Sequence, residues 1–579
     1  TPFQYNPATK ELQVLTNVEI KIEIEGGKGT LDDQRLRSPW FEPILQDMLV
    51  NYSDLPKVQK SPVNGKSSIG YEYLIVVPND PAWLPYAEQI REFRNQQGIL
   101  TGIVTLSEIG GNTATTIEAY IDNAYNNWDI PPVAVLLMAD YGSDATNRIT
   151  SFEYSHPYSG TYITDNTYAD VSGNSLPDII FARMAAEDVS QLEVLVSKVI
   201  EYETNPPTDP SFYASPVTAL GWQTERWFQI CSEVIGGFMQ TLGKTPVRIN
   251  EIYSGTPGTT WSTATNTSTV VNYFGPDGLG YIPATPDELG NWSGGNATMI
   301  SNAINSGSFM VVHRDHGGET LWGEPSYSTS HINALTNDKL PFVFSLNCLT
   351  GKFNRSGECF AEAFHRHTYN GNNSGALGLI AASQVSYSFV NDTYAWGMFD
   401  NFFPDFMPDY GMSQVQERGV LPAFGNASGK YFLQQSNWPY NTYNKEITYN
   451  LFHHHGDAFS VIFTEVPQNL AVTHNSSMLS SASSFDVIAP EGSLIGLSVN
   501  GELIGSAWSY GGSTTIPINP QSPQDVMVVT VTKQNFNRYQ ATVTIEAPAG
   551  ACVMYNNHTV NDIAFNGNGV AEYGETVNL

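Results

Sequence analysis

The pattern of apolar and polar positions changes its period twice along the chain. Apolar and polar side chains alternate over residues 12–24, and this period of two predicts short strands within residues 1–25. One helix is expected near residues 41–50, in an otherwise irregular stretch. Residues 55–70 are rich in Lys, Pro, Ser and Gly, which is typical of a linker.

From residue 71, short apolar runs alternate with segments of helical period. The expected strands are residues 71–78, 99–106, 133–140, 178–184, 216–221, 247–253, 308–313, 341–348 and 375–383, and the expected helices are 83–97, 115–127, 190–203 and 226–242. This alternation predicts βαβ units around a parallel sheet. Ligands of such sheets bind beyond the carboxyl ends of the strands, so the chemistry should follow these runs directly.

After residue 466 the chain consists of short strand-like runs and turn signals, with no helical segment. This predicts a β-sandwich over residues 466–546 and the start of a further β module at 547–579. The α/β region is therefore residues 71–465, which we divide into subdomains at 71–215 and 216–465. We also expect both ends of the sequence to be internal to a longer precursor, because no initiator Met or signal peptide precedes the first strand.

The composition excludes some classes of function. With 41% hydrophobic residues, the 579-residue chain can form large cores, and it has no apolar run of 18 residues that would predict a membrane span. The net charge of −31 would repel phosphate backbones and anionic lipids, which argues against nucleic-acid binding. Only 14% of residues are charged, and surfaces of neutral polar groups are common outside the cell.

Two of the apolar runs end in side chains that could catalyse a reaction. Residues 308–313 lead to His316, Gly317 and Gly318, and residues 341–348 end at Cys348. The 32 positions between His316 and Cys348 are enough for a crossover to a neighbouring parallel strand. An imidazole beside a thiol increases the fraction of nucleophilic thiolate and can later protonate a leaving amine.

The sequence also allows other interpretations of these His and Cys residues. A single Cys at a strand end is more often a structural thiol than a nucleophile. The four cysteines are too few and too scattered for a disulfide framework. His453, His454 and His455 are consecutive, and because side chains alternate along an extended chain, we do not expect them to converge on a metal.

The segments around His316 and Cys348 resemble the gingipain family of bacterial cysteine peptidases, which belongs to the caspase-like clan. The likeness runs from about residue 71 to 545 and is densest at 309–390. The matching segments are His316–Gly317, residues 319–325, residues 334–344, Cys348, residues 351–353, 359–364 and 377–389, and the turn at 456–460.

The resemblance implies a caspase-like parallel-sheet catalytic domain with two subdomains, followed by an Ig-like sandwich. It makes Cys348 the nucleophile and His316 its partner, with Gly317 and Cys348 as backbone donors to an oxyanion. Residues 1–54 resemble the end of the family's inhibitory prodomain, so residues 55–70 would be an activation region with Lys60 and Lys66 as cleavage points. No cofactor is required for the chemistry, but structural Ca²⁺ is implied.

The sequence also departs from the family. Gingipains cleave after Arg or Lys and use an acidic residue at the base of the substrate pocket, where this chain has Gln229. Phe389 falls at the aromatic pocket wall, and we assign Trp322 to the same pocket. A neutral pocket of this kind favours a preference other than Arg or Lys. The candidates for a carboxylate that faces His316 are Glu225 and Asp315.

We therefore expect a secreted or cell-surface bacterial endopeptidase that is made as a zymogen and acts on proteins or peptides. Two alternatives are a sortase-like transpeptidase of the type IX secretion system and a non-catalytic surface or adhesion protein on a peptidase-like scaffold. We also expect a Ca²⁺ site at an oxygen-rich loop near the end of the sequence, formed by Asp562, Asn566, Asn568 and Glu575.

Overall fold

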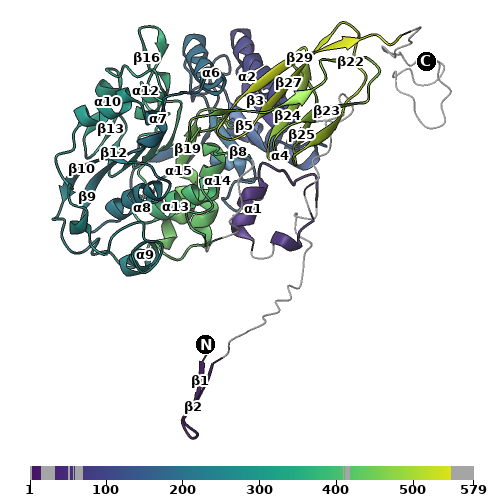
Figure 1. Ribbon diagram of the computed structural model, residues 1–579. Helices are drawn as coiled ribbons and strands as arrows, with labels where there is room; N and C mark the ends of the chain where they lie inside the picture. Colours follow the sequence, from purple (N-terminus) through teal and green to yellow (C-terminus); the bar gives the residue numbers. More distant parts are fainter. Residues whose placement is uncertain are drawn as a thin grey trace.

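The computed structural model describes residues 3–14, 33–49, 52–56, 58, 70–408, 410 and 418–549 (Figure 1). Its largest element is a ten-stranded sheet. In spatial order the strands are β10 (Val247–Ser254), β9 (Val217–Gln223), β11 (Met310–Arg314), β15 (Phe342–Leu346), β18 (Gly378–Ala382), β19 (Phe452–His455), β8 (Ile180–Arg183), β5 (Ala134–Leu137), β3 (Tyr73–Val77) and β4 (Thr101–Thr105). The predicted α/β class is confirmed.

All neighbouring strands of this sheet are parallel except β18 and β19, which run antiparallel. β19 joins two halves: β3, β4, β5 and β8 precede residue 216 in the sequence, and β9, β10, β11, β15 and β18 follow it. The contact between β19 and β8 is a single pair, His455 with Arg183. The two expected subdomains are thus the two halves of one continuous sheet.

Helices cover both faces of the sheet (Figure 1). The longer ones are α2 (Leu84–Gln97), α4 (Ala114–Asn127), α6 (Val189–Thr204), α8 (Phe228–Thr241), α10 (Ala297–Ser306), α13 (Val390–Phe402) and α14 (Pro422–Gln435). Asp188 caps the first turn of α6 by accepting from the N–H groups of Ser190 and Gln191, and Gly98 ends α2 in a left-handed conformation. These ends agree with the helices expected at 83–97 and 190–203.

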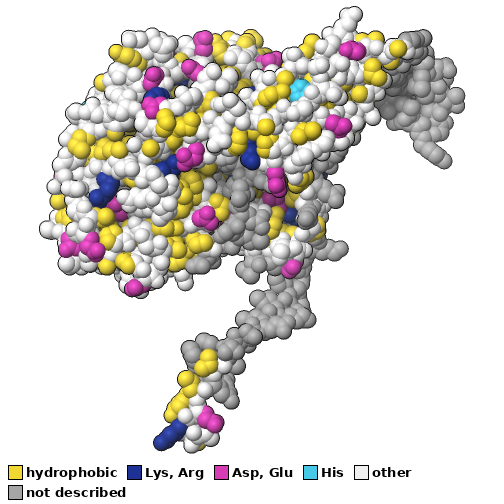
Figure 2. All heavy atoms as spheres, viewed as in Figure 1, with side chains coloured by type: hydrophobic (Ala, Val, Ile, Leu, Met, Phe, Trp, Pro, Cys, Tyr) yellow, Lys and Arg dark blue, Asp and Glu magenta, His cyan; other side chains and the backbone are white. Residues whose placement is uncertain are grey.

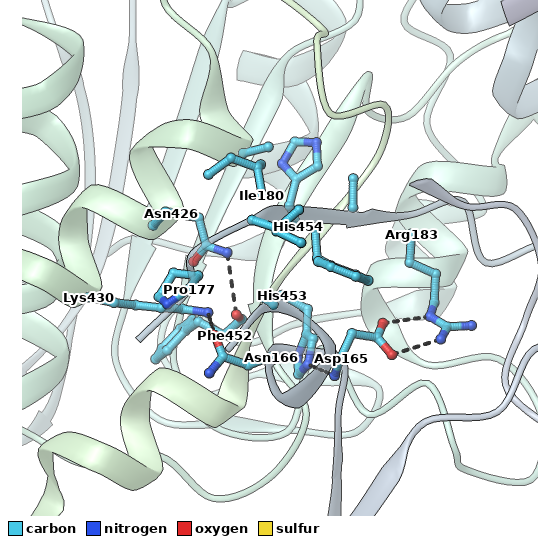
Figure 3. A pocket seen from close by; sticks show the side chains of 16 residues that line it. Asp165, Asn166, Pro177, Ile180, Arg183, Asn426, Lys430, Phe452, His453 and His454 are labelled. Carbon is cyan, nitrogen blue, oxygen red and sulfur yellow. Dashed lines mark hydrogen bonds and ion pairs between the residues drawn. The ribbon is translucent and has the colours of Figure 1, made fainter. Parts of the chain in front are cut away.

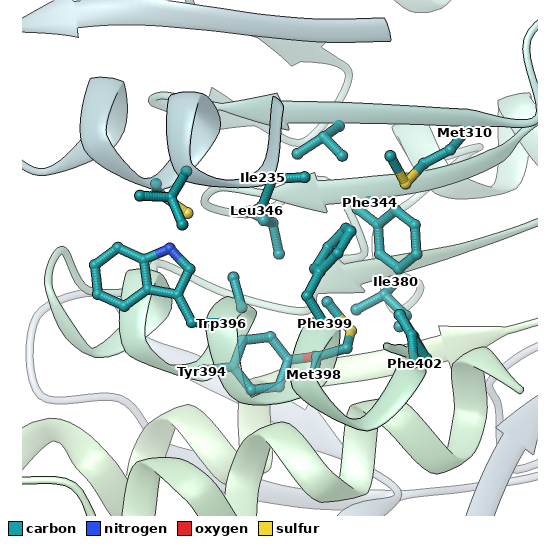
Figure 4. Close-up of a cluster of buried hydrophobic side chains, with 14 of the residues drawn as sticks. Ile235, Met310, Phe344, Leu346, Ile380, Tyr394, Trp396, Met398, Phe399 and Phe402 are labelled. Atoms are coloured by element: carbon teal, nitrogen blue, oxygen red, sulfur yellow. The ribbon is translucent and has the colours of Figure 1, made fainter. Parts of the chain in front are cut away.

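Alternate side chains of β15 enter different cores, as the period of a strand requires. Phe344 and Leu346 join the core formed with α8 and α13, where they lie near Phe399 and Ile380 (Figure 4). Val343 joins the core on the other face, with α10 and the short helix α12 (Phe360–Arg366). Burial on both faces explains why this strand is a continuous apolar run in the sequence.

The carboxyl-terminal part is a sandwich of two main sheets, as predicted. One contains β21 (Thr473–His474), β23 (Ser484–Ile488) and β26 (Ser513–Pro517). The other contains β22 (Ser477–Leu479), β29 (Tyr539–Glu546), β27 (Val526–Thr532), β24 (Leu494–Val499) and β25 (Glu502–Trp508).

The sandwich docks on helix α2 of the α/β region. Arg91 pairs with Glu502 at 2.8 Å, and Arg538 donates to the carbonyl of Phe93 at 3.0 Å. A Cβ at Gly496 would lie 2.1 Å from the carbonyl oxygen of Gln96, so the two backbones are too close for a side chain at this position.

The described amino-terminal residues form a hairpin and a docked segment. β1 (Phe3–Asn6) pairs with β2 (Glu11–Val14), and helix α1 (Glu42–Met48) lies where a helix was expected. Trp40 is buried, and its ring meets Phe459 at 5.0 Å and Trp508 of the sandwich at 5.3 Å. Most of the expected alternation at residues 12–24 lies outside the described residues, as do Lys60, Lys66 and the whole of 551–579.

The molecular face in Figure 2 carries scattered charged side chains among neutral polar and apolar ones, without a basic patch. Within the described ranges, no helix is long and apolar enough to cross a membrane.

Candidate active site

The parallel register of β11 and β15 brings the candidate His and Cys to one place. Arg314 stands opposite Leu346 at the ends of these strands, and each chain continues by two residues, to His316 and to Cys348. Both side chains line an open cleft of about 340 Å³, together with Phe228 from the start of α8. The predicted meeting beyond adjacent strand ends is confirmed.

Gly317 is required for this approach. A Cβ at Gly317 would lie 2.6 Å from the carbonyl oxygen of Cys348, closer than non-bonded atoms can approach. Any side chain at Gly317 would therefore displace the Cys348 backbone. The backbone N–H of Cys348 donates to no carbonyl among the described residues, so it is available to a bound oxyanion.

Cys348 is half-buried, and its sulfur contacts the loop that follows β18. The backbone N–H of Ser386 donates to Sγ at 3.3 Å, and the Ser386 hydroxyl lies 3.8 Å from it. The described cysteines Cys231 and Cys359 are free and buried, and burial raises the pKa of both thiols. Of these three cysteines, only Cys348 lines the cleft.

His316 makes its side-chain hydrogen bond to an amide. Its Nε2 lies 2.7 Å from Oε1 of Gln223, the last residue of β9, and Nε2 of Gln223 donates to Oε1 of Glu225 at 2.6 Å. Because a carboxylate only accepts, Glu225 fixes the orientation of the Gln223 amide, and Oε1 must accept from His316. The proton of the neutral ring is therefore on Nε2, and Nδ1 is the basic nitrogen.

The surroundings of His316 favour the neutral ring. Burial lowers the pKa of His316 to about 4, and the positive charges of Arg314 and Arg226 act in the same direction. The ring packs against Tyr253 at 4.4 Å and edge-on against Phe228 at 5.4 Å, measured between ring centroids. At neutral pH this imidazole can accept a proton.

Neither candidate for a third member contacts His316 directly. Glu225 is exposed and reaches the ring only through the Gln223 amide. Asp315 lines the cleft, but its Oδ2 accepts from the backbone N–H of Glu324 at 2.5 Å, and burial raises its pKa to about 7. The group that orients His316 is thus Gln223, which lies two residues before the candidate Glu225.

Trp322 does not line the cleft and lies beneath the segment that ends at Cys348. Its indole stacks on His313 at 4.3 Å and donates to the Ser345 hydroxyl at 2.8 Å. His313 in turn contacts Asn347 at 2.7 Å. This buried network holds the residue that precedes Cys348, so Trp322 supports the site from below; its assignment to the substrate pocket is corrected.

Gln229 is also outside the cleft. It is fully buried in α8, where its Nε2 donates to the carbonyls of Trp261 at 2.6 Å and Arg226 at 2.9 Å. Phe389 does line the cleft, and its ring meets Tyr440 at 4.4 Å. Phe389 has a φ of 72°, a region that costs a non-Gly residue about 1–3 kcal/mol, and a hydrogen bond from its N–H to Asp392 at 2.8 Å holds it there.

Sequence reasoning missed several residues of the cleft. Arg226 follows the carboxyl end of β9, so the rule about strand ends could have found it. Tyr158 comes from the turn between β6 (Phe152–Ser155) and β7 (Thr161–Thr164), and Tyr440 and Tyr443 precede α15 (Lys445–Leu451). Nothing in the sequence pattern connects these aromatic residues with Cys348.

The consecutive histidines contact different parts of the chain. His453 accepts from the N–H of Asp165 at 3.0 Å, beside the ion pair of Asp165 and Arg183 (Figure 3). His454 instead contacts the carbonyl of Asp457 at 3.1 Å. Within the described part of the chain, no three His, Cys, Asp or Glu side chains are grouped as metal ligands. The Ca²⁺ candidates Asp562, Asn566, Asn568 and Glu575 lie outside the described residues.

A parallel α/β sheet with a thiol and an imidazole at the ends of adjacent strands is the arrangement expected of a cysteine peptidase. Comparison with known families agrees: the model of peptidase family C25 matches residues 66–458, and that of the family's carboxyl-terminal Ig-like domain matches 473–546. The chain belongs to peptidase family C25, the gingipain family.

The relatives are remote in sequence. Gingipain R2 of Porphyromonas gingivalis is 23% identical over 555 residues, which cover 93% of this chain and 65% of that protein. Lys-gingipain of the same species is 23% identical over 572 residues, covering 92% of this chain and 29% of the relative. The chain thus spans less than two thirds of the length of these relatives.

Among solved structures, the Arg-specific cysteine proteinase gingipain R matches with a TM-score of 0.66 and 21% identity, over 84% of this chain and all of that one. The complex of gingipain pro- and mature domains from P. gingivalis matches with a TM-score of 0.66 and 20% identity, over 82% of this chain. These likenesses establish the fold.

Proposed function

We propose that this protein is a cysteine endopeptidase in which Cys348 attacks the scissile carbonyl and His316 carries the proton. The observation that supports this most is the shared cleft, which both side chains enter from adjacent parallel strands. Membership of family C25 agrees with this reaction.

The state of His316 sets the order of the proton transfers. With the Nε2 proton held by Gln223, Nδ1 of the neutral ring takes the proton of the Cys348 thiol as sulfur attacks. The resulting imidazolium then gives this proton to the leaving amine. A thioester remains on Cys348, and a water molecule, deprotonated by the same ring, hydrolyses it.

The negative oxygen of the tetrahedral intermediate needs donors that are free of other bonds. The N–H of Cys348 meets this condition, and we assign it this role together with the N–H of Gly317. No metal or cofactor takes part in these steps. We retain structural Ca²⁺ as a proposal, for which the described residues supply no cluster of ligating side chains.

We further propose a specificity other than Arg or Lys. A basic substrate side chain needs an accessible carboxylate, and the acids in the cleft wall and behind it, Asp315 and Asp392, are both buried. Asp392 pairs with Arg314 at 2.6 Å, and Asp315 is bonded to the backbone and has a pKa of about 7. An extracellular location and an inhibitory prodomain ending in residues 1–54 complete the proposal; the low charged content and the docked segment at Trp40 support them.

Cleavage of a mixed peptide library by the full chain tests the function, with and without Ca²⁺. Wild type should cut and Cys348→Ala should not, while Cys359→Ala serves as the control, because Cys359 is buried away from the cleft. An added amine separates hydrolysis from transpeptidation, because only a transpeptidase would convert most of the product to the amide. Equal cutting by wild type and Cys348→Ala would reject the assignment.

A further inference from the structure

Arg226 is a cleft residue that the proposed reaction does not use. It lies in the turn between β9 and α8, where its backbone N–H donates to the carbonyl of Gln223 at 2.9 Å. Its side chain lines the same cleft as Cys348 and His316, and its guanidinium carbon lies 5.9 Å from the centre of the Phe389 ring. The charge is therefore placed at the wall next to the reacting groups.

The guanidinium of Arg226 has no carboxylate partner among the residues that the structure describes. No Asp or Glu oxygen of a described residue lies within ion-pair distance of this guanidinium, and its Nε is buried without a hydrogen-bond acceptor among the same residues. The neighbouring acid Glu225 directs Oε1 to Gln223 instead. The cleft's other cation, Arg314, has its charge balanced by Asp392 at 2.6 Å.

Buried or half-buried charges are normally paired, because removing a cation from water without a counter-ion is costly. The adjacent acid Glu225 is exposed and acts on Arg226 only at a distance beyond an ion pair, and the neighbouring rings of Phe389 and Tyr440 carry no charge at neutral pH. An anion that enters the cleft from outside would balance this charge. A carboxylate suits this place, because a guanidinium can bind it through two parallel N–H···O bonds.

We propose that Arg226 binds an acidic side chain of the substrate, so that the enzyme cleaves after Asp or Glu. This inference rests on the proposed peptidase function and names its substrate class. A Lys or Arg side chain at the same position would meet an unbalanced positive charge and be rejected.

Asp315 is the alternative charge in the cleft, and it would favour a basic substrate. Asp315 is 1% exposed, and its carboxyl lies between two glycines: a Cβ at Gly221 would lie 2.3 Å from its Cγ, and one at Gly323 2.6 Å from its Oδ2. A carboxyl enclosed in this way cannot approach a substrate ammonium without moving the backbone of β9. Arg226 is the more accessible charge.

The test compares peptides with blocked carboxyl termini that differ only in the residue before the scissile bond: Asp, Asn, Glu, Gln or Arg. Wild type should cleave the Asp or Glu peptide with a kcat/KM roughly 10- to 100-fold above its amide counterpart, the range for a hydrogen bond to a charged group. Comparing the Asp peptide with the Glu peptide shows which length of acidic side chain the cleft accepts better. Arg226→Gln should remove this ratio, and Arg226→Glu should invert it toward the Arg peptide.

Arg91→Gln is the matched control, because Arg91 lies on α2 outside the cleft, and it should keep the wild-type ratio. Cleavage that needs Cys348 but shows no preference between acid and amide would overturn the inference and leave the function standing. If no peptide is cut, the preference for an acidic side chain can still be measured. Cys348 is then alkylated with peptidyl acyloxymethyl ketones that carry Asp or Asn next to the reactive ketone. Faster labelling by the Asp probe supports the inference, and equal rates reject it.

Discussion

The pair Gln223 and Glu225 offers a sensitive test of how His316 is held. We consider exchanging the two residues in the double variant Gln223→Glu/Glu225→Gln, which keeps the net charge and the hydrogen bond between them. The amide of residue 225 would then donate to the new carboxylate, and this carboxylate would accept from Nε2 of His316 across the same 2.7 Å. Only the group that faces the ring changes.

The size of the expected change in the pKa of His316 follows from the short distance between the ring and residue 223. Two unit charges about 4 Å apart at the edge of a protein interact by about 4 kcal/mol, which corresponds to roughly three pKa units. The carboxylate favours the imidazolium, so the pKa of His316 should rise from about 4 to around neutrality. Below its new pKa the ring is protonated and cannot take the Cys348 proton, so the acid limb of kcat/KM should move to higher pH by the same amount.

The assay is NMR titration of ¹³C-labelled histidine rings, with the His316 signal assigned by its loss in His316→Asn. Glu225→Gln alone is the control, and it should change the His316 pKa by far less than the exchange does, because the amide at Gln223 still faces the ring. If the exchanged variant titrates within one unit of wild type, the proposed contact between His316 and Gln223 is wrong.

Three further predictions concern Gly317, a buried ion pair and Asp315. Gly317→Ala should leave the melting temperature within a few degrees but lower kcat/KM at least tenfold, because its Cβ would displace the Cys348 carbonyl; an active variant would contradict this. Arg94→Met should lower the free energy of unfolding by about 3–5 kcal/mol in denaturant titration, because Asp457 would be left as an uncompensated buried charge. Asp315 has a folded-state pKa raised from 3.8 to about 7, so its stabilising protonated form is lost as pH rises through about 7. Asp315→Asn should therefore gain stability relative to wild type between pH 4 and pH 8, by up to about 4 kcal/mol; a constant difference between the two proteins would refute the assigned pKa.

Much of the fold could be predicted because both faces of its central strands are buried. Strands such as β15 and β18 are continuous apolar runs, and the capped helices between them have clear ends. β19 could not be predicted, because its side chains His453, His454 and His455 are polar, yet all three are buried. His453 is bonded by Asp165 of a distant segment, whereas neither ring nitrogen of His455 has a hydrogen-bond partner among the described residues.

The candidate site, like the fold, could be predicted from the sequence only in part. His316 and Cys348 follow directly from strand ends, and the parallel register then brings them together. The pocket around them was harder to predict, because it depends on which way side chains of a helix or loop point. Gln229 and Arg226 are three positions apart, yet Gln229 turns into the core and Arg226 into the cleft.

The central claim is that Cys348 forms the covalent intermediate, and trapping this intermediate tests it most directly. A reaction with a cleaved peptide, quenched in acid within milliseconds and analysed by mass spectrometry, should show the acyl group of the substrate on Cys348 as a thioester. Cys348→Ala should show no adduct. Continued cleavage with the acyl group on another residue, or with no adduct under conditions where acylation outpaces hydrolysis, would contradict the account.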